Sequence, residues 1–386
     1  MNSRDRLAAL KQKNELRQLT PVKRLASGQL LMQDHAGLPL LDFSSNDYLA
    51  LSGHAELIEQ SRRFLDKAGC GAGAARLMSG DLAMYHLLEA ETAQLKGREA
   101  ALLFGSGYMA NCGVIPALMG RHDVIFADRL NHASIYDGCS LSNAKIVRFR
   151  HNDMNHLEEL LRRQRGKAGA LIVVESLYSM DGDRCPLRDI VALKDKYNCL
   201  LMVDEAHATG LFGQRGGGII EEEGVTDRVD IAMGTFGKAL GSYGAYVAAD
   251  RPMIDLLINR ARTFIYSTGL PPAVIGASLA AIRIVRQQPE LRHDLFARVD
   301  FFKAALRDNG LTDLGPSQIV PILIGDSGRA VRIAQLLRDQ GVYATAVRPP
   351  TVPRGTARLR FSITRHLGRE ELAHTATLIS AALRCG

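Results

Sequence analysis

Short apolar runs and stretches with helical spacing alternate along the chain from about residue 85 to residue 250. The runs are nearly continuous in apolar residues, which is typical of strands that are covered on both faces. Between most of them lie about 10–15 residues in which apolar positions recur at helical spacing. The runs are A-A-L-L-F (100–104), D-V-I-F-A (123–127), K-I-V-R-F (145–149), A-L-I-V-V-E (170–175), C-L-L-M-V-D-E (199–205), V-D-I-A-M-G-T (229–235) and G-A-Y-V-A-A-D (244–250). This alternation predicts an α/β fold with a mostly parallel sheet and helices on both faces.

The two ends of the chain have a different pattern. Residues 1–24 predict a basic helix that ends at Pro21, and a short β segment follows from Gln29 to Phe43. After Pro272 a long helical stretch leads to a region that mixes helices with the runs I-V-P-I-L-I, V-Y-A-T-A-V and A-R-L-R-F-S-I, which is typical of a smaller α+β domain. We therefore expect an N-terminal helix and β segment (1–45), a large domain (46–285) and a small C-terminal domain (286–386).

Composition excludes several classes of protein. The 386 residues are 46% hydrophobic and 23% charged, which fits a folded chain with a large core. No apolar run approaches the roughly 20 residues that span a bilayer, and the charged N-terminus resembles no secretion signal, so we expect a cytoplasmic protein without a membrane segment. The six cysteines are scattered without a C-x-x-C pair, so neither a metal site nor a disulfide framework is predicted.

The net charge of +7 is spread along the chain, no basic stripe interleaves with aromatic residues, and tryptophan is absent. Nucleic-acid binding is therefore not expected, and anionic substrates or an acidic partner explain the excess charge better.

One lysine, Lys238, lies among small residues and glycines in T-F-G-K-A-L-G-S-Y-G (235–244). A lysine that attacks a carbonyl needs a lowered pKa and little bulk around it, which these neighbours allow. A phosphate-binding P-loop is excluded, because Ala232 stands where its first glycine is needed and Ala239 where it needs a hydroxyl. The lysine is therefore interpreted as a reactive amine.

Polar residues follow the ends of several predicted strands, where ligands of an open parallel sheet bind. They are Gly105–Tyr108, Asn131–Ser134, Leu177–Asp183, Asp204–His207, and Thr235 with Lys238. The G-S-G turn opens a helix, and the N–H groups at a helix start suit a phosphate, although a plain tight turn explains this feature alone.

Asp204 ends a strongly apolar strand, so its carboxylate is expected to be buried and to need a partner. A salt bridge or a helix cap would satisfy it, and so would a cationic ring nitrogen. Together with the amine of Lys238 and an upstream phosphate cradle, the aspartate meets the three requirements of pyridoxal 5'-phosphate: a ring-nitrogen partner, a Schiff-base amine and a phosphate site.

Motifs along almost the whole chain resemble the α-oxoamine synthase family of fold-type I pyridoxal-phosphate enzymes. They are S-S-N-D-Y-L (44–49), N-H-A-S (131–134), Y-S-M-D-G-D (178–183), D-E-A-H (204–207), T-F-G-K (235–238), I-Y-S-T (265–268) and R-P-P-T-V-P-R-G-T-A-R-L-R (348–360). Two positions depart from the family pattern: Ala50 stands where glycine is usual after D-Y-L, and Ala74 interrupts the glycine-rich G-A-G-A-A-R.

The resemblance implies a role for each matching residue. Lys238 would bind the cofactor and later remove the α-proton of the amino acid, Asp204 would pair with the ring nitrogen, and His132 would stack on the ring. The remaining implied contacts are Ser179 and His207 near the phenolic oxygen; Gly107, Tyr108 and Thr235 near the phosphate, with Ser267 and Thr268 reaching it in cis or from a partner subunit; Arg360 and Asn46 at the amino-acid carboxylate; and Arg17 and Thr351 at the acyl substrate.

The resemblance also implies a decarboxylating condensation of an amino acid with an acyl thioester, carried out by a homodimer. The R-P-P-T portion discriminates within the family and favours the branch that joins L-alanine to a pimeloyl thioester in biotin synthesis. The pimeloyl group would be carried by CoA or by acyl carrier protein.

Other interpretations stay open from the sequence alone. A sister enzyme would use glycine or serine, an aminotransferase would share the fold without the condensation, and a binding protein would lack catalysis. The last disagrees with the presence of Lys238, Asp204 and His132.

Overall fold

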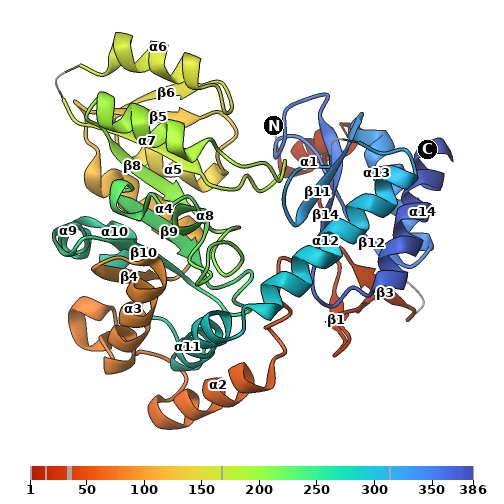
Figure 1. Ribbon diagram of the computed structural model, residues 1–386, viewed down its shortest axis with the longest axis horizontal. Helices are drawn as coiled ribbons and strands as arrows, with labels where there is room; N and C mark the ends of the chain where they lie inside the picture. Colours follow the sequence, from red (N-terminus) through yellow and green to blue (C-terminus); the bar gives the residue numbers. More distant parts are fainter. Residues whose placement is uncertain (1, 14, 33–36, 167, 313, 386) are drawn as a thin grey trace. The chain divides into compact units, whose positions relative to one another are not determined.

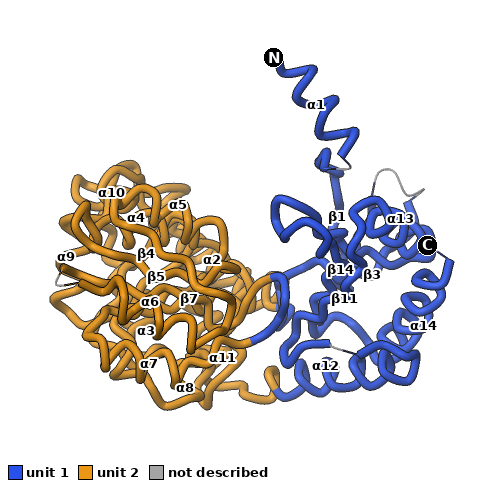
Figure 2. The backbone as a smooth tube through the Cα atoms, turned by 90° about the horizontal axis from the view of Figure 1, so that it is seen from above, with its two compact units in different colours: residues 1–50, 180–183, 293–386 blue, residues 51–179, 184–292 orange. Residues whose placement is uncertain are grey.

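The computed structural model describes residues 2–13, 15–32, 37–166, 168–312 and 314–385. Two compact units are distinguished in Figure 2. Unit 1 consists of residues 1–50, 180–183 and 293–386, and unit 2 of residues 51–179 and 184–292. The three-part division expected from the sequence, with boundaries after residues 45 and 285, stays a prediction.

Unit 2 is built on a seven-stranded sheet in the order β4-β10-β9-β8-β7-β5-β6. Its strands are β4 (Ala100–Phe104), β5 (Val124–Asp128), β6 (Lys145–Phe149), β7 (Ala170–Glu175), β8 (Leu200–Asp204), β9 (Ile231–Thr235) and β10 (Ala245–Ala249). Each overlaps one of the seven apolar runs. Strand β10 pairs antiparallel with β4 and β9, and the other pairs are parallel, so the mostly parallel sheet of an α/β fold is confirmed.

Helices cover this sheet on both sides (Figure 1). The helices of unit 2 are α2 (Ala55–Ala68), α3 (Ala83–Lys96), α4 (Gly107–Leu118), α5 (Ala133–Leu141), α6 (Met154–Gln164), α7 (Leu187–Lys196), α8 (Ile219–Glu222), α9 (Arg251–Arg260), α10 (Arg262–Ile265) and α11 (Pro272–Gln287), with short helical turns at Arg76–Gly80 and Thr226–Arg228. Alternate strand residues such as Leu102, Val173 and Val247 pack against α4, α5 and α9 in one continuous core. Residues of the opposite parity, such as Leu103, Ile172 and Tyr246, are also buried, which explains why the runs are apolar throughout.

Unit 1 contains two small sheets. One has the order β1-β2-β3-β12 and the other β11-β14-β13. The elements are α1 (Ser3–Gln12), β1 (Val22–Arg24), β2 (Leu30–Met32), β3 (Pro39–Asp42), α12 (Glu290–Asp308), β11 (Ile319–Gly325), α13 (Ser327–Asp339), β12 (Val342–Tyr343), β13 (Thr345–Val347), β14 (Ala357–Ser362) and α14 (Arg369–Cys385). Within it β12 pairs parallel with β3, so Val342 lies opposite Leu41.

The N-terminal helix is shorter than the sequence predicts. Helix α1 ends at Gln12 instead of extending to Pro21, and residues 22–24 form strand β1. The helix buries none of its residues, so no packing supports its extension. The proline at position 21 also disfavours helical conformation at Thr20.

The run V-Y-A-T-A-V forms two short strands instead of one. Strand β12 joins the first sheet of unit 1 and β13 joins the second, with Ala344 between them. A continuous apolar run indicates burial, and it does not specify which sheet each residue joins.

Within the described ranges, no helix is long and apolar enough to cross a membrane.

Candidate active site

The strand ends of unit 2 border a pocket with a volume of about 210 Å³. A single buried water needs roughly 10–15 Å³, so the pocket has room for a ligand of many atoms. Its lining residues are Gly107, Tyr108, Asn111, His132, Ser134, Glu175, Asp204, Ala206, His207, Met233, Thr235 and Lys238. The structure therefore brings the predicted lysine, aspartate, two histidines and three phosphate-site residues together.

Lys238 lies in the connection between the antiparallel strands β9 and β10. Gly241 closes this connection by donating its N–H to the carbonyl oxygen of Lys238 over 2.9 Å. Gly241 has a φ of +60°, and a Cβ atom there would lie 2.4 Å from the backbone nitrogen of Ser52, so glycine is required. The resulting loop places Nζ of Lys238 2.8 Å from Nε2 of His207.

Asp204 ends β8 and is 5% exposed. Its Oδ1 accepts the N–H of Ala206 over 2.9 Å, and its Oδ2 accepts the side-chain amide of Asn111 over 3.1 Å. A buried carboxylate needs such donors, and two of them on different oxygens fix its orientation. Asn111 comes from the interior of α4 and belongs to none of the sequence motifs.

His132 caps the N-terminus of α5 and borders the open pocket. Its Nδ1 accepts the N–H of Ser134 over 3.2 Å and lies 2.7 Å from the hydroxyl oxygen of that residue. Desolvation by the protein atoms around the ring lowers its pKa, the Asp204 carboxylate opposes this shift, and the Lys238 amine adds to it. The ring therefore favours the neutral form.

Glu175 is a second buried carboxyl in the pocket, which sequence reasoning missed. It is 3% exposed at the end of β7, and its Oε1 accepts the N–H of His132 over 2.5 Å. Burial raises its pKa well above the ordinary range, and the neighbouring Asp204 carboxylate raises it further. A carboxyl residue that ends an apolar strand, as Asp204 does, is the sequence signal that could have found it.

The N-terminus of α4 forms the end of the pocket that suits a phosphate. Ser106 caps this helix, and its hydroxyl accepts the N–H of Met109 over 3.2 Å. A Cβ atom on Gly107 would lie 3.1 Å from the methyl group of Thr235, so a larger residue would narrow this end. The first N–H groups of any helix lack intrahelical acceptors and attract an anion.

Tyr108 lines the same end with an exposed ring. Its hydroxyl donates to the Asp137 carboxylate, and this hydrogen bond raises the pKa of Tyr108 to about 12. The side chain is thus a neutral hydrogen-bonding group at neutral pH.

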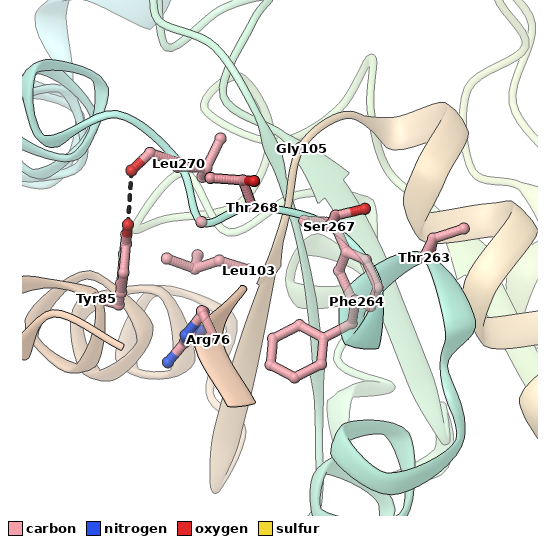
Figure 3. A pocket seen from close by; sticks show the side chains of 11 residues that line it. Arg76, Tyr85, Leu103, Gly105, Thr263, Phe264, Ser267, Thr268 and Leu270 are labelled. Atoms are coloured by element: carbon pink, nitrogen blue, oxygen red, sulfur yellow. Dashed lines mark hydrogen bonds between the residues drawn. The ribbon is translucent and has the colours of Figure 1, made fainter. Parts of the chain in front are cut away.

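Three other predicted residues of unit 2 do not line this pocket. Ser179 is buried after β7, and its N–H is hydrogen-bonded to Glu175. Ser267 and Thr268 line a separate small cavity with Arg76 and Tyr85, where the Tyr85 hydroxyl donates to the carbonyl oxygen of Leu270 over 2.7 Å (Figure 3). One chain alone therefore does not bring Ser267 and Thr268 into the pocket of Lys238.

The predicted substrate residues form two pairs within unit 1. Arg360, which is 7% exposed, donates from Nη2 to Oδ1 of Asn46 over 3.1 Å. Arg17 donates from Nη2 to the hydroxyl of Thr351 over 2.7 Å. Each arginine thus lies beside the residue that the sequence assigns to the same substrate group. Burial lowers the pKa of the nearby Arg348, and the positive charge of Arg17 lowers it further.

A buried ion pair supports the D-E-A-H segment. Lys96 of α3 and Glu205 are 3% and 0% exposed, and the lysine amine donates to this carboxylate and to the carbonyl oxygen of Gly217. Glu205 also accepts the N–H of Ile220 over 2.9 Å. These bonds anchor the residue next to Asp204 to a helix and to the glycine-rich loop at 213–218, and removing one charge would leave the other buried without its partner.

Comparison with known proteins identifies the family. The family model "Aminotransferase class I and II" matches residues 39–379. An 8-amino-7-oxononanoate synthase of Geobacter sulfurreducens is 50% identical over 323 residues, which cover 83% of this chain and 82% of that protein. The chain belongs to the 8-amino-7-oxononanoate synthase family. Enzymes of this family are acyltransferases that depend on pyridoxal phosphate.

Solved structures similar to this synthase-family chain share its fold. A Sphingomonas wittichii serine palmitoyltransferase is 32% identical with a TM-score of 0.92, and the match covers 99% of this chain and 96% of that one. An 8-amino-7-oxononanoate synthase of Francisella tularensis is 29% identical with a TM-score of 0.76, covering 90% and 98%. The fold-type I architecture predicted from the sequence is confirmed.

The residues of the pocket fit the cofactor of the family. A lysine amine, a buried carboxylate held by two donors and the N-terminus of a helix border one cavity. The buried Oδ1 of Asn111 has no hydrogen-bond partner among the described protein atoms, so this polar wall is not fully satisfied by the protein itself. No group of three or more His, Cys, Asp and Glu residues in the described part of the chain could hold a metal ion.

Proposed function

We propose that this chain condenses L-alanine with a pimeloyl thioester to give 8-amino-7-oxononanoate, carbon dioxide and the free thiol of the carrier. The observation that carries the proposal is the pocket that joins Lys238, Asp204 and His132, in a chain that is 50% identical to a synthase of that name. When bound, pyridoxal phosphate withdraws electrons from the α-carbon of the amino acid.

In this proposal the side chains of unit 2 hold the cofactor and move the proton. The amine of Lys238 holds the cofactor and then accepts the α-proton of alanine, with His207 2.8 Å away to hydrogen-bond with it. The carboxylate of Asp204 would pair with the ring nitrogen, and the imidazole of His132 would stack on the ring. The N–H groups at the start of α4, with Thr235, would hold the phosphate.

The side chains of unit 1 bind the substrates. The guanidinium of Arg360 presents a planar fork to the alanine carboxylate, and Asn46, which accepts one of its N–H groups, keeps the fork oriented. Arg17, held by Thr351, contacts the acyl substrate. Either an acidic acyl carrier protein or CoA would be attracted by the net charge of +7, so both carriers stay within the proposal.

We further propose that the enzyme is a cytoplasmic homodimer. Leu77, Met78 and Tyr266 of unit 2 are 52%, 79% and 71% exposed, which is unusual for large apolar side chains and is explained if a second copy covers them. A partner subunit would also supply Ser267 and Thr268 to a phosphate that they do not approach within one chain. Analytical ultracentrifugation of the wild-type protein and of Met78→Lys tests this, since a monomeric wild-type protein would contradict the proposal.

Serine is the main competing amino acid, because the serine palmitoyltransferase structure has the higher TM-score of the two. Fold similarity does not select a substrate, however, and the sequence identity to the synthase is higher. The deciding experiment measures carbon dioxide and thiol release with alanine, glycine or serine, each against pimeloyl-CoA, pimeloyl-acyl carrier protein and palmitoyl-CoA. We expect turnover with alanine and a pimeloyl thioester; preference for serine and palmitoyl-CoA would overturn the proposal.

A further inference from the structure

A continuous chain of hydrogen bonds connects Asp204 to His132. The amide nitrogen of Asn111 lies 3.1 Å from Oδ2 of Asp204 and 2.9 Å from the hydroxyl oxygen of Ser134. That hydroxyl lies 2.7 Å from Nδ1 of His132. The two connecting residues come from the neighbouring helices α4 and α5 and are each 1% exposed.

The side chains of Asp204, Asn111, Ser134 and His132 fix which group donates and which accepts in each hydrogen bond of this series. The amide of Asn111 has two hydrogens, which are donated to Asp204 and to the oxygen of Ser134. The hydroxyl of Ser134 accepts from Asn111, so its own hydrogen is available for Nδ1 of His132. The backbone N–H of Ser134 also donates to Nδ1, at 3.2 Å. A ring nitrogen that accepts two donors carries no proton, which places the proton of the neutral imidazole on Nε2.

Both ends of this chain carry contacts assigned to the cofactor ring. In the proposed function, Asp204 would pair with the ring nitrogen and His132 would stack on the ring. Because Asn111 and Ser134 are buried and already bonded to each other, neither end can rotate without breaking a bond inside the protein. The positions of the Asp204 carboxylate and the His132 imidazole are therefore linked, both mechanically and electrostatically.

We propose that Asn111 and Ser134 are positioning residues that hold Asp204 and His132 as one unit against the cofactor ring and fix His132 in the Nε2-protonated tautomer. This inference rests on the proposed function only through the identity of the ligand. Neither residue touches the reacting atoms, so their effect appears in cofactor binding and in the titration of His132.

The first test is cofactor affinity, measured by titrating the cofactor-free protein with pyridoxal phosphate and following absorbance. Asn111→Leu keeps a similar volume and removes the donor to Asp204, and we expect the half-saturating concentration to rise about tenfold, as loss of one charge-assisted hydrogen bond implies. Ser134→Ala should raise it by a smaller factor, and Ser134→Thr, which retains a hydroxyl, should restore it. Asp204→Asn removes the carboxylate itself and should therefore give the largest rise in the half-saturating concentration.

The second test needs no cofactor. In protein labelled with ¹⁵N-histidine, His132 is assigned by comparison with His132→Gln, and its tautomer and pKa are read from the nitrogen shifts. Ser134→Ala removes a donor that stabilises the neutral ring, so the pKa of His132 should rise by roughly 0.4–1 unit. Ser134→Thr should leave it near the wild-type value.

Thr92→Val is the matched control, because Thr92 is 0% exposed and its hydroxyl donates to the carbonyl oxygen of Leu88 in α3, outside the chain of bonds. The inference is overturned if Asn111→Leu and Ser134→Ala keep wild-type cofactor affinity and His132 pKa and only lower the Tm, as the control does. If Asn111→Leu does not fold, the comparison of Ser134→Ala with Ser134→Thr decides alone. All readouts omit alanine and thioester, so failure of the proposed reaction would not be confused with failure here.

Discussion

Glu175 and Asp204 lie directly opposite each other in register at the ends of the parallel strands β7 and β8. Two carboxyl groups are thus buried side by side, and only one of them has a predicted partner in the ring nitrogen of the cofactor. The raised pKa of Glu175 follows from its burial and from this neighbour. The protein consequently has a titratable group whose protonated form is favoured by folding.

Stability should therefore depend on pH through Glu175. Its pKa is raised above the ordinary 4.5, so its contribution to stability is complete below about pH 4.5 and is lost as the pH rises through the folded-state pKa. Glu175→Gln cannot titrate, while its amide oxygen can still accept the N–H of His132. In cofactor-free protein, the urea concentration at the unfolding midpoint should rise for Glu175→Gln relative to wild type as the pH increases. Glu59→Gln, on an exposed position of α2, is the surface control. A stability difference between Glu175→Gln and wild type that is independent of pH would contradict the assignment.

Lys238 should be the residue that binds the cofactor covalently. Borohydride reduction of the loaded wild-type protein should bleach its visible band and add the mass of the reduced cofactor to the peptide containing Lys238, and Lys238→Ala should lose both. The sharpest control is Lys303, because its burial lowers its pKa to about 8 and makes it the competing nucleophile. Lys303→Arg should be labelled as wild type is. Stoichiometric labelling of Lys238→Ala would show that another amine serves as the site.

Ala50 should be a position where glycine stabilises the protein. Its φ is +57°, a conformation that costs a residue with a side chain roughly 1–2 kcal/mol, whereas glycine adopts it readily. After subtraction of the extra freedom of glycine in the unfolded chain, Ala50→Gly should raise stability by about 0.5–1 kcal/mol. Ala304→Gly, at an exposed position inside α12, should instead lower it by about 1 kcal/mol. Thermal unfolding measures both variants. An equal loss of stability in Ala50→Gly and Ala304→Gly would show that the positive φ of Ala50 does not affect stability.

Arg17 should affect the acyl thioester and leave alanine binding unchanged. Removing a charge-assisted contact predicts that Arg17→Ala raises the KM for the thioester by roughly 10–100-fold. Thr351→Val removes the hydroxyl that orients the guanidinium and should cause a smaller rise. Arg6→Ala removes a positive charge from the exposed helix α1 and should have little effect. If Arg17→Ala and Arg6→Ala behave alike across a salt titration, Arg17 is only a surface charge.

The sequence predicts best what depends on local burial. Strand β4 coincides with the run A-A-L-L-F, and every strand of the seven-stranded sheet overlaps its predicted run, because strands between two layers of helices are mostly apolar. The predicted end of α1 was wrong for the complementary reason, since none of the residues of that helix is buried.

The site was predictable where a residue follows a strand, as Asp204 and Lys238 do, because topology places all such ends at one edge. Asn111 could not be found in this way. It lies in the second turn of α4, where an asparagine has no local signature, and its role arises only from contact with a strand more than ninety residues away. Ser134 was visible inside N-H-A-S, yet its function depends on the direction of a hydrogen bond, which the sequence does not record.

The parallel pairing of β3 with β12 has a consequence for biosynthesis. Leu41 leaves the ribosome 301 residues before its partner Val342, and at about 5–20 residues per second the interval is roughly 15–60 s. Throughout that time the apolar side chains of Leu30, Met32 and Leu40 lack the strand that carries Tyr343, which packs against them in the finished protein. The N-terminal segment accordingly lacks its covering strand until late in synthesis, while the sheet that carries Lys238 can assemble before the C-terminal third is translated.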